Sequence, residues 1–122
     1  MLRRKGVAKD DRQAVGLFSA AAQQHFFIAQ NKLGSMYATG RGVPKNEVVA
    51  YALFELAMTV SPEYEGWELA SKESVVPAEK NRALMAAHLQ PEQIKAAQRL
   101  SVEMAEADNF NDVITQYLAH AQ

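Results

Sequence analysis

The sequence predicts an all-α fold: a right-handed superhelix of antiparallel helix pairs, closed at its C-terminal end by capping helices. The chain matches itself at an offset of 36 residues, with seven identities among the sixteen positions from Gly6 to Ala21. Apolar residues recur at i, i+3, i+4 and i+7 along most of the chain, and no segment shows the alternation of a strand. A repeat of this period is typical of helical solenoids, in which each unit covers the apolar face of its neighbour.

Length and composition indicate a single globular domain spanning residues 1–122. Hydrophobic residues make up 48% of the chain and the net charge is −1, so the basic face that binds nucleic acid is not expected. The absence of cysteine excludes disulfides and cysteine-bound zinc. No apolar run approaches the ~20 residues that cross a bilayer, and the basic start lacks the apolar stretch of a signal peptide. We therefore expect a soluble chain, either cytoplasmic or part of a longer exported protein.

Charge is distributed unevenly along the chain. Residues 1–12 carry five basic and two acidic side chains, a net charge of +3, whereas residues 100–122 carry four acidic side chains and no lysine or arginine, a net charge of −4. Two solvated faces would explain this pattern. Head-to-tail attraction between chains, or a charged end that meets a partner, would explain it as well.

The first two predicted helices follow from capping residues and apolar stripes. Asp10 or Asp11 can cap a first helix over residues 11–23, and because the repeat begins inside a unit, no helix is expected before Gly6. The buried stripe of this helix consists of Ala14, Leu17, Phe18, Ala21 and Ala22. A second helix is expected over residues 25–38, with Phe26, Ala29, Leu33 and Tyr37 facing inward.

A glycine–proline turn is expected between the second and third helices. Gly34, inside the second helix, predicts a close approach of the neighbouring helix, since a mid-helix glycine costs ~1 kcal/mol relative to alanine. Gly40 and Gly42 tolerate the left-handed backbone that ends a helix. Asn46 is expected to cap a third helix over residues 46–59. The inner face of that helix repeats the first stripe as Ala50, Leu53, Phe54, Ala57 and Met58.

Residues 6–60 therefore hold about one and a half repeats, and residues 61–122 are interpreted as a degenerate repeat with C-terminal capping helices. Terminal units of solenoids are atypical because one of their faces meets water. Helices are expected over residues 77–89 and 91–107, and a last helix from Asp108 or Asn109 to residue 118. Residues 61–77 fit either a helix over 61–70 followed by a loop at 74–77, or a loop throughout. The residues expected to face inward in the last three helices are Leu84, Met85, Leu89, Ile94, Ala97, Leu100, Met104, Val113, Ile114, Tyr117 and Leu118.

A fixed pattern of alanine, glycine, tyrosine and a proline turn occupies residues 29–46 and continues into the next helix. The residues that carry it are Ala29, Leu33, Gly34, Tyr37, Gly40, Gly42, Val43, Ala50, Leu53, Phe54 and Ala57. This pattern resembles the signature of the Sel-one-like repeat family, whose helix–turn–helix units are related to tetratricopeptide repeats. Gln24 departs from the family's usual glycine, and Leu17 and Leu53 stand where tryptophan is frequent. Residues 89–100 are similar to the segment that closes many bacterial members.

The resemblance implies a non-catalytic adaptor or scaffold that binds a protein or peptide partner through the groove of the solenoid, with no enzyme activity and no cofactor. Phe27, Asn31 and Ser35 recur at i, i+4 and i+8 on one face of the second helix, and we expect them to contact that partner. Trp67 is the only tryptophan, a residue favoured at interface hot spots. The alternative is that Trp67 packs inside the capping core.

No arrangement of residues in the sequence predicts catalysis or a metal site. His25, His88 and His120 are far apart, and none has the histidine–carboxylate spacing of a metal-binding helix. The main alternative to an adaptor is a structural module. Because the chain starts inside a repeat, the helix over residues 11–23 can expose an apolar edge, which a second copy would cover in a homodimer.

Overall fold

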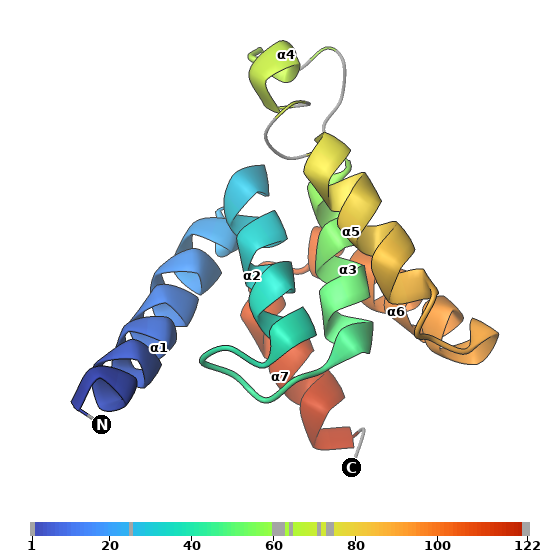
Figure 1. The fold of residues 1–122 in the computed structure, drawn as a ribbon. Helices are drawn as coiled ribbons and strands as arrows, with labels where there is room; N and C mark the ends of the chain where they lie inside the picture. The colour runs from blue at the N-terminus through green and yellow to red at the C-terminus, as the bar shows by residue number, and fades with distance from the viewer. Residues whose placement is uncertain are drawn as a thin grey trace.

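The computed structural model describes residues 2–24, 26–59, 63, 65–70, 72 and 75–120, and for residues 2–9 and 70 it describes the backbone alone. The described residues form helices and turns and contain no strand, which confirms the all-α prediction (Figure 1). The helices are α1 (Leu2–Gln23), α2 (Phe27–Thr39), α3 (Glu47–Ala57), α4 (Trp67–Ala70), α5 (Val76–Ala86), α6 (Pro91–Glu106) and α7 (Phe110–His120).

The first helix starts earlier than the sequence predicts. α1 runs without interruption from Leu2, so the expected cap at Asp10 or Asp11 is absent, and the segment before the first repeat is helical. The second copy of this segment forms a turn that contains Pro44, whereas the first copy has Ala8 at the same position. Proline breaks a helix because its ring clashes with the preceding turn and it lacks an N–H donor. With alanine instead, the segment continues the helix.

α2 and α3 form the antiparallel pair expected of one repeat unit (Figure 1). α2 ends at Gly40, whose φ of 73° is left-handed and whose N–H donates to the Met36 carbonyl oxygen. Gly42 also has a positive φ, of 75°. Asn46 then caps α3, because its side chain accepts a hydrogen bond from the Val49 N–H at 3.0 Å. The glycine stop and the asparagine cap are both confirmed.

A tight contact joins α2 to α3 at Gly34. A Cβ built on Gly34 would lie 2.7 Å from Cε1 of Phe54, and Phe54 is only 1% exposed, so its ring has little room to move. Only a hydrogen atom fits between the α2 backbone and the phenyl ring. The predicted close approach of a neighbouring helix at Gly34 is therefore confirmed.

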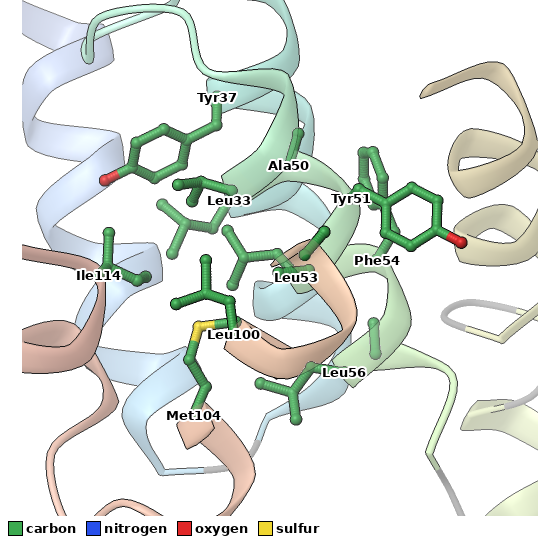
Figure 2. Packing of buried hydrophobic residues seen from close by; sticks show 14 of the residues in the cluster. Leu33, Tyr37, Ala50, Tyr51, Leu53, Phe54, Leu56, Leu100, Met104 and Ile114 are labelled. Atoms are coloured by element: carbon green, nitrogen blue, oxygen red, sulfur yellow. The ribbon is translucent and has the colours of Figure 1, made fainter. Parts of the chain in front are cut away.

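α3 forms the centre of the core. Nine of its eleven residues are buried, on all sides of the helix rather than on the single stripe that the sequence predicts. It packs against α2, α5 and α6. Figure 2 shows Leu53 of α3 near Leu33 of α2 and Leu100 of α6. Toward α5, the Arg82 guanidinium donates to Oε1 of Glu55 at 2.9 Å, so that helix is held by an ion pair as well as by apolar contact.

α6 and α7 form a hairpin that folds back over one side of the other helices (Figure 1). α6 packs against α3 and α7, and α7 reaches α1. Leu100, Met104 and Ile114 are buried in this hairpin, as the sequence predicts. The Asn111 side chain of α7 donates to the Ser19 carbonyl oxygen of α1 at 3.3 Å. The hairpin therefore connects the C-terminal helices to the first helix of the chain.

Phe26 and Leu84, which the sequence places inside, are exposed. Phe26 is 59% exposed, because α2 begins after it, at Phe27, and Phe26 lies outside the helical stripe. Leu84 is 54% exposed. α5 faces α3 with Arg82, and residues two apart on a helix point in nearly opposite directions. Both predictions of burial are therefore wrong.

Two predicted segments also differ in extent. The helix predicted over residues 61–70 is present as α4, Trp67–Ala70, and residues 61, 62 and 64 lie outside the described residues, as does His25. α5 begins at Val76, inside the predicted loop. α4 stands apart from the other helices (Figure 1). α4 therefore contributes little to the core that supports the groove described below.

Replacing Gly34 by alanine tests whether the α2–α3 contact needs a glycine. We expect Gly34→Ala to lower the free energy of unfolding, measured by urea denaturation, by about 1–3 kcal/mol, as overpacking of a filled core does. Gly16→Ala is the matched control, because nothing lies within 4 Å of a Cβ placed there. That control should stabilise the protein by up to ~1 kcal/mol through helix propensity. Equal effects of the two substitutions would contradict the packing argument.

Candidate binding groove

An open groove with a volume of about 380 Å³ lies between α1 and α2. Its lining residues are Asp11, Ala14, Phe18, Lys32, Ser35, Met36, Thr39 and Arg41. Leu33 and Tyr37 of α2 point into the core beside Ile114 of α7 (Figure 2). Because residues two apart on a helix point in nearly opposite directions, Ser35 lies on the side of α2 away from α7. The capping hairpin therefore leaves the groove uncovered.

The groove combines apolar and polar side chains. Ala14 and Phe18 of α1 and Met36 of α2 supply apolar surface, while Lys32 and Ser35 of α2 supply a cation and a hydroxyl. Lys32 is exposed and, among the residues that the structure describes, has no ion-pair partner. Such a surface suits a protein segment that carries both apolar and polar side chains.

One ion pair joins the α2–α3 turn to α1. Nη2 of Arg41 donates to Oδ1 of Asp11 at 2.8 Å. This hydrogen bond, together with the charge of Asp11, raises the pKa of Arg41. The turn lies directly on α1, since a Cβ on Gly42 would be 2.6 Å from the Asp11 carbonyl oxygen. The Arg41 side chain is 62% exposed, so solvent screens the pair. We conclude that it orients the turn and adds little to stability.

The structure separates the residues predicted to contact a partner. Ser35 lines the groove. Asn31 lies toward α5, where its Oδ1 accepts a hydrogen bond from Nδ2 of Asn81 at 3.3 Å. Phe27 is half-buried at the start of α2. Trp67 is half-buried on α4, which stands apart from α1 and α2 (Figure 1). Of the four predicted contacts, Ser35 alone lies in this groove, and the roles of the other three stay predictions.

Sequence reasoning missed most of the residues that line the groove. Lys32, Met36 and Thr39 recur with Ser35 at helical spacing, on a face of α2 next to the predicted one. That spacing is the signal that could have found them. The ion pair of Arg41 instead joins residues 30 apart in the sequence, and no local pattern indicates such a contact.

The α1 residues Ala14 and Phe18 that line the groove belong to an apolar stripe, with Leu17 beside the groove, whose repeat equivalent is buried. Leu17 is 72% exposed, whereas Leu53, its counterpart 36 residues later, is 0% exposed. Phe18 is half-buried, whereas Phe54 is 1% exposed. α2 and α6 pack against α3, and among the described residues no helix covers the stripe of α1 in the same way. The predicted burial of Leu17 is therefore wrong, because it requires a neighbour that α1 lacks.

The described residues hold no group of three or more histidine, cysteine, aspartate or glutamate side chains that could bind a metal ion. Nδ1 of His88 lies 2.8 Å from Oε2 of Glu47, and Nδ1 of His120 lies 2.7 Å from the Gln116 carbonyl oxygen. In the same part of the chain, every helix is too short or too polar to cross a bilayer.

Comparison with known families points to the region that contains the groove. A family model of the Sel1 repeat matches residues 1–26 and residues 28–57. The first match covers α1, and the second covers α2, the turn and α3. No curated protein and no solved structure matches the chain. The two walls of the groove thus come from two adjacent repeat matches.

Alanine substitutions at the equivalent positions Leu17 and Leu53 test which of the two apolar stripes is covered. We expect Leu53→Ala to lower the free energy of unfolding by about 2–5 kcal/mol, because it opens a cavity in the core. Leu17→Ala should change it by no more than about 0.5 kcal/mol, as is usual at surface positions. Urea denaturation at low protein concentration, followed by circular dichroism, measures both. Equal destabilisation by the two substitutions would mean that Leu17 is covered in the isolated chain.

Proposed function

We propose that the chain, which belongs to the Sel1 repeat proteins, is a non-catalytic adaptor or scaffold that binds a partner protein in the groove between α1 and α2. Sel1 repeats are helical modules that generally mediate contacts between proteins. The observation that carries the proposal is the α1 wall of the groove, where half-buried Phe18 keeps apolar surface that its repeat equivalent Phe54 buries. Contiguous apolar surface of this kind usually marks a site of interaction.

The composition of the groove supports a protein as its ligand. Phe18 and Met36 offer apolar contact, and Lys32 and Ser35 offer a cation and a hydroxyl beside them. The groove is open along one side, so a segment of polypeptide could lie along it and continue over the neighbouring surface of α2. Asn31, at the α5 side of α2, would extend the contact surface in that direction.

The proposal includes the absence of enzyme activity. The Sel1 repeat family consists of interaction modules. A catalytic base must lie within hydrogen-bond reach of a bound substrate. The lining of the groove contains no histidine, and its carboxylate, Asp11, is paired with Arg41. His88 and His120 instead contact single neighbours on other helices or on their own helix.

Filling the groove by mutation should prevent partner binding. We expect Ser35→Trp to abolish capture of the partner from an extract of the source cell, because the indole occupies the groove. Gln98→Trp, at an exposed position of α6, is the matched control and should capture the same protein as the wild-type chain. Affinity capture with quantitative mass spectrometry measures this, once circular dichroism shows equal helix content. If the Ser35→Trp chain still captures the partner and a Trp67→Ala chain does not, the binding site lies at α4 and the proposed groove site is wrong.

A homodimer through the outer edge of α1 is the second candidate. Leu17 is 72% exposed, and Gly16 and Ala20 beside it are exposed and small, so a second helix could approach closely. Two such edges related by a two-fold axis would cover each other. Light scattering should then give a mass that rises from 13.5 kDa with concentration and levels at two chains, and Leu17→Glu should keep the chain monomeric. A single-chain mass at every concentration would exclude this candidate.

A further inference from the structure

We infer that the groove between α1 and α2 binds an acidic amphipathic segment of a partner protein, whose apolar side chains pack on α1 and whose carboxylates lie along α2. The inference rests on the proposed function, because it names the chemistry of the partner that fills the same groove. It follows from the way in which apolar and charged side chains are divided between the two walls. The chain as a whole has a net charge of −1, so a positively charged groove is a local feature and not a consequence of composition.

Apolar side chains line the α1 wall beyond Asp11 and continue at the base of the α2 wall. Ala14 and Phe18 of α1 line the groove, and both are half-buried. Met36 of α2 lines it as well and is 7% exposed. Ile28, which is 37% exposed, lies one turn before Lys32 on the same face of α2. Apolar side chains of a partner would be removed from water against this surface, which favours binding.

The α2 wall carries a positive charge toward each end of the groove. Lys32 and Arg41 both line the groove, and Lys32 is exposed without an ion-pair partner among the described residues. Thr39, which lies two residues before Arg41, follows Lys32 by seven residues, or about 10 Å along the helix. Lys45 is also exposed and lies near Arg41, since a Cβ on Gly40 would be 3.2 Å from the Cβ of Lys45.

Asp11, the carboxylate of the described lining, does not cancel these charges. Its Oδ1 accepts a hydrogen bond from Nη2 of Arg41 at 2.8 Å. A guanidinium has five N–H donors, and the Arg41 side chain is 62% exposed, so Arg41 can also bind a carboxylate of the partner. Asp10 is exposed as well, but it lies seven residues before Leu17 on the outer side of α1 and does not line the groove.

Charge complementarity therefore selects the partner. Carboxylates along one edge of a bound segment would be attracted to Lys32 and Arg41, whereas a basic segment would place like charges beside Lys32. Placing like charges together suppresses binding of the wrong partner. Asp10, on the outer side of α1, repels an acidic edge from that side, so the carboxylates of the segment are directed toward α2.

Selection from a library of random peptides tests this chemistry without knowledge of the partner. The wild-type chain should enrich peptides that combine apolar residues with aspartate and glutamate, relative to the unselected library. Lys32→Glu should enrich peptides with lysine and arginine instead, because it reverses the charge of an exposed cation in the groove. Lys95→Glu, at an exposed position of α6 outside the groove, is the matched control and should select the same acidic peptides as the wild type.

Fluorescence anisotropy with the best acidic peptide measures the size of the effect. Lys32→Gln should weaken binding about two- to fivefold, the range expected for an exposed ion pair, and Lys32→Glu should weaken it further because like charges then meet. Added salt should weaken binding to the wild type, because it screens exposed charges. Ser35→Trp should abolish binding, since the indole occupies the groove. Circular dichroism must show equal helix content for all variants.

A basic or uncharged consensus, or a selection that enriches no peptide, would overturn the inference. So would acidic peptides that bind Ser35→Trp as tightly as the wild type, because their site would lie outside the groove. The proposed function is judged separately, by capture of the partner from the source cell. Capture that is lost with Ser35→Trp but unchanged with Lys32→Glu would keep the groove as the binding site and reject the acidic chemistry of its ligand.

Discussion

The contact between the phenyl ring of Phe54 and the backbone of Gly34 determines how closely α2 and α3 approach, and the other helices are arranged around that pair. Phe54 is 1% exposed and a Cβ on Gly34 would lie 2.7 Å from its ring, so only a hydrogen atom fits between the ring and the α2 backbone. With α2 this close on one side, α3 can bury its remaining sides against α5 and α6. The left-handed Gly40 and the Asn46 cap keep the connection between the pair short. Disturbing this contact would therefore affect the whole core.

The same apolar stripe occurs on α1 and on α3, but only the stripe on α3 is covered by neighbouring helices. The stripe on α3 is covered by α2 and α6, while the equivalent stripe on α1 forms one wall of an open groove. At the other edge, α5 has α3 on one side and no described helix on the other. Free edges are inherent in repeat proteins, because each unit contacts only its neighbours.

The groove and the capping hairpin lie on opposite sides of α2. Leu33 and Tyr37 face the hairpin on one side, and Ser35 lines the groove on the other. A partner protein could therefore bind in the groove without displacing the hairpin.

The sequence by itself determined the helical class, the repeat, the glycine stop, the asparagine cap and the close approach at Gly34, since each depends on local backbone geometry or on a residue's size. It also placed Ser35 on an outward face of α2. Only the tertiary structure decided which apolar stripes are covered. Leu17 and Leu53 share one local pattern, yet they are 72% and 0% exposed, and Asn31 finds its hydrogen-bond partner 50 residues away. Burial and long-range contacts depend on which helices come to lie beside a residue, and a local pattern carries no information about that.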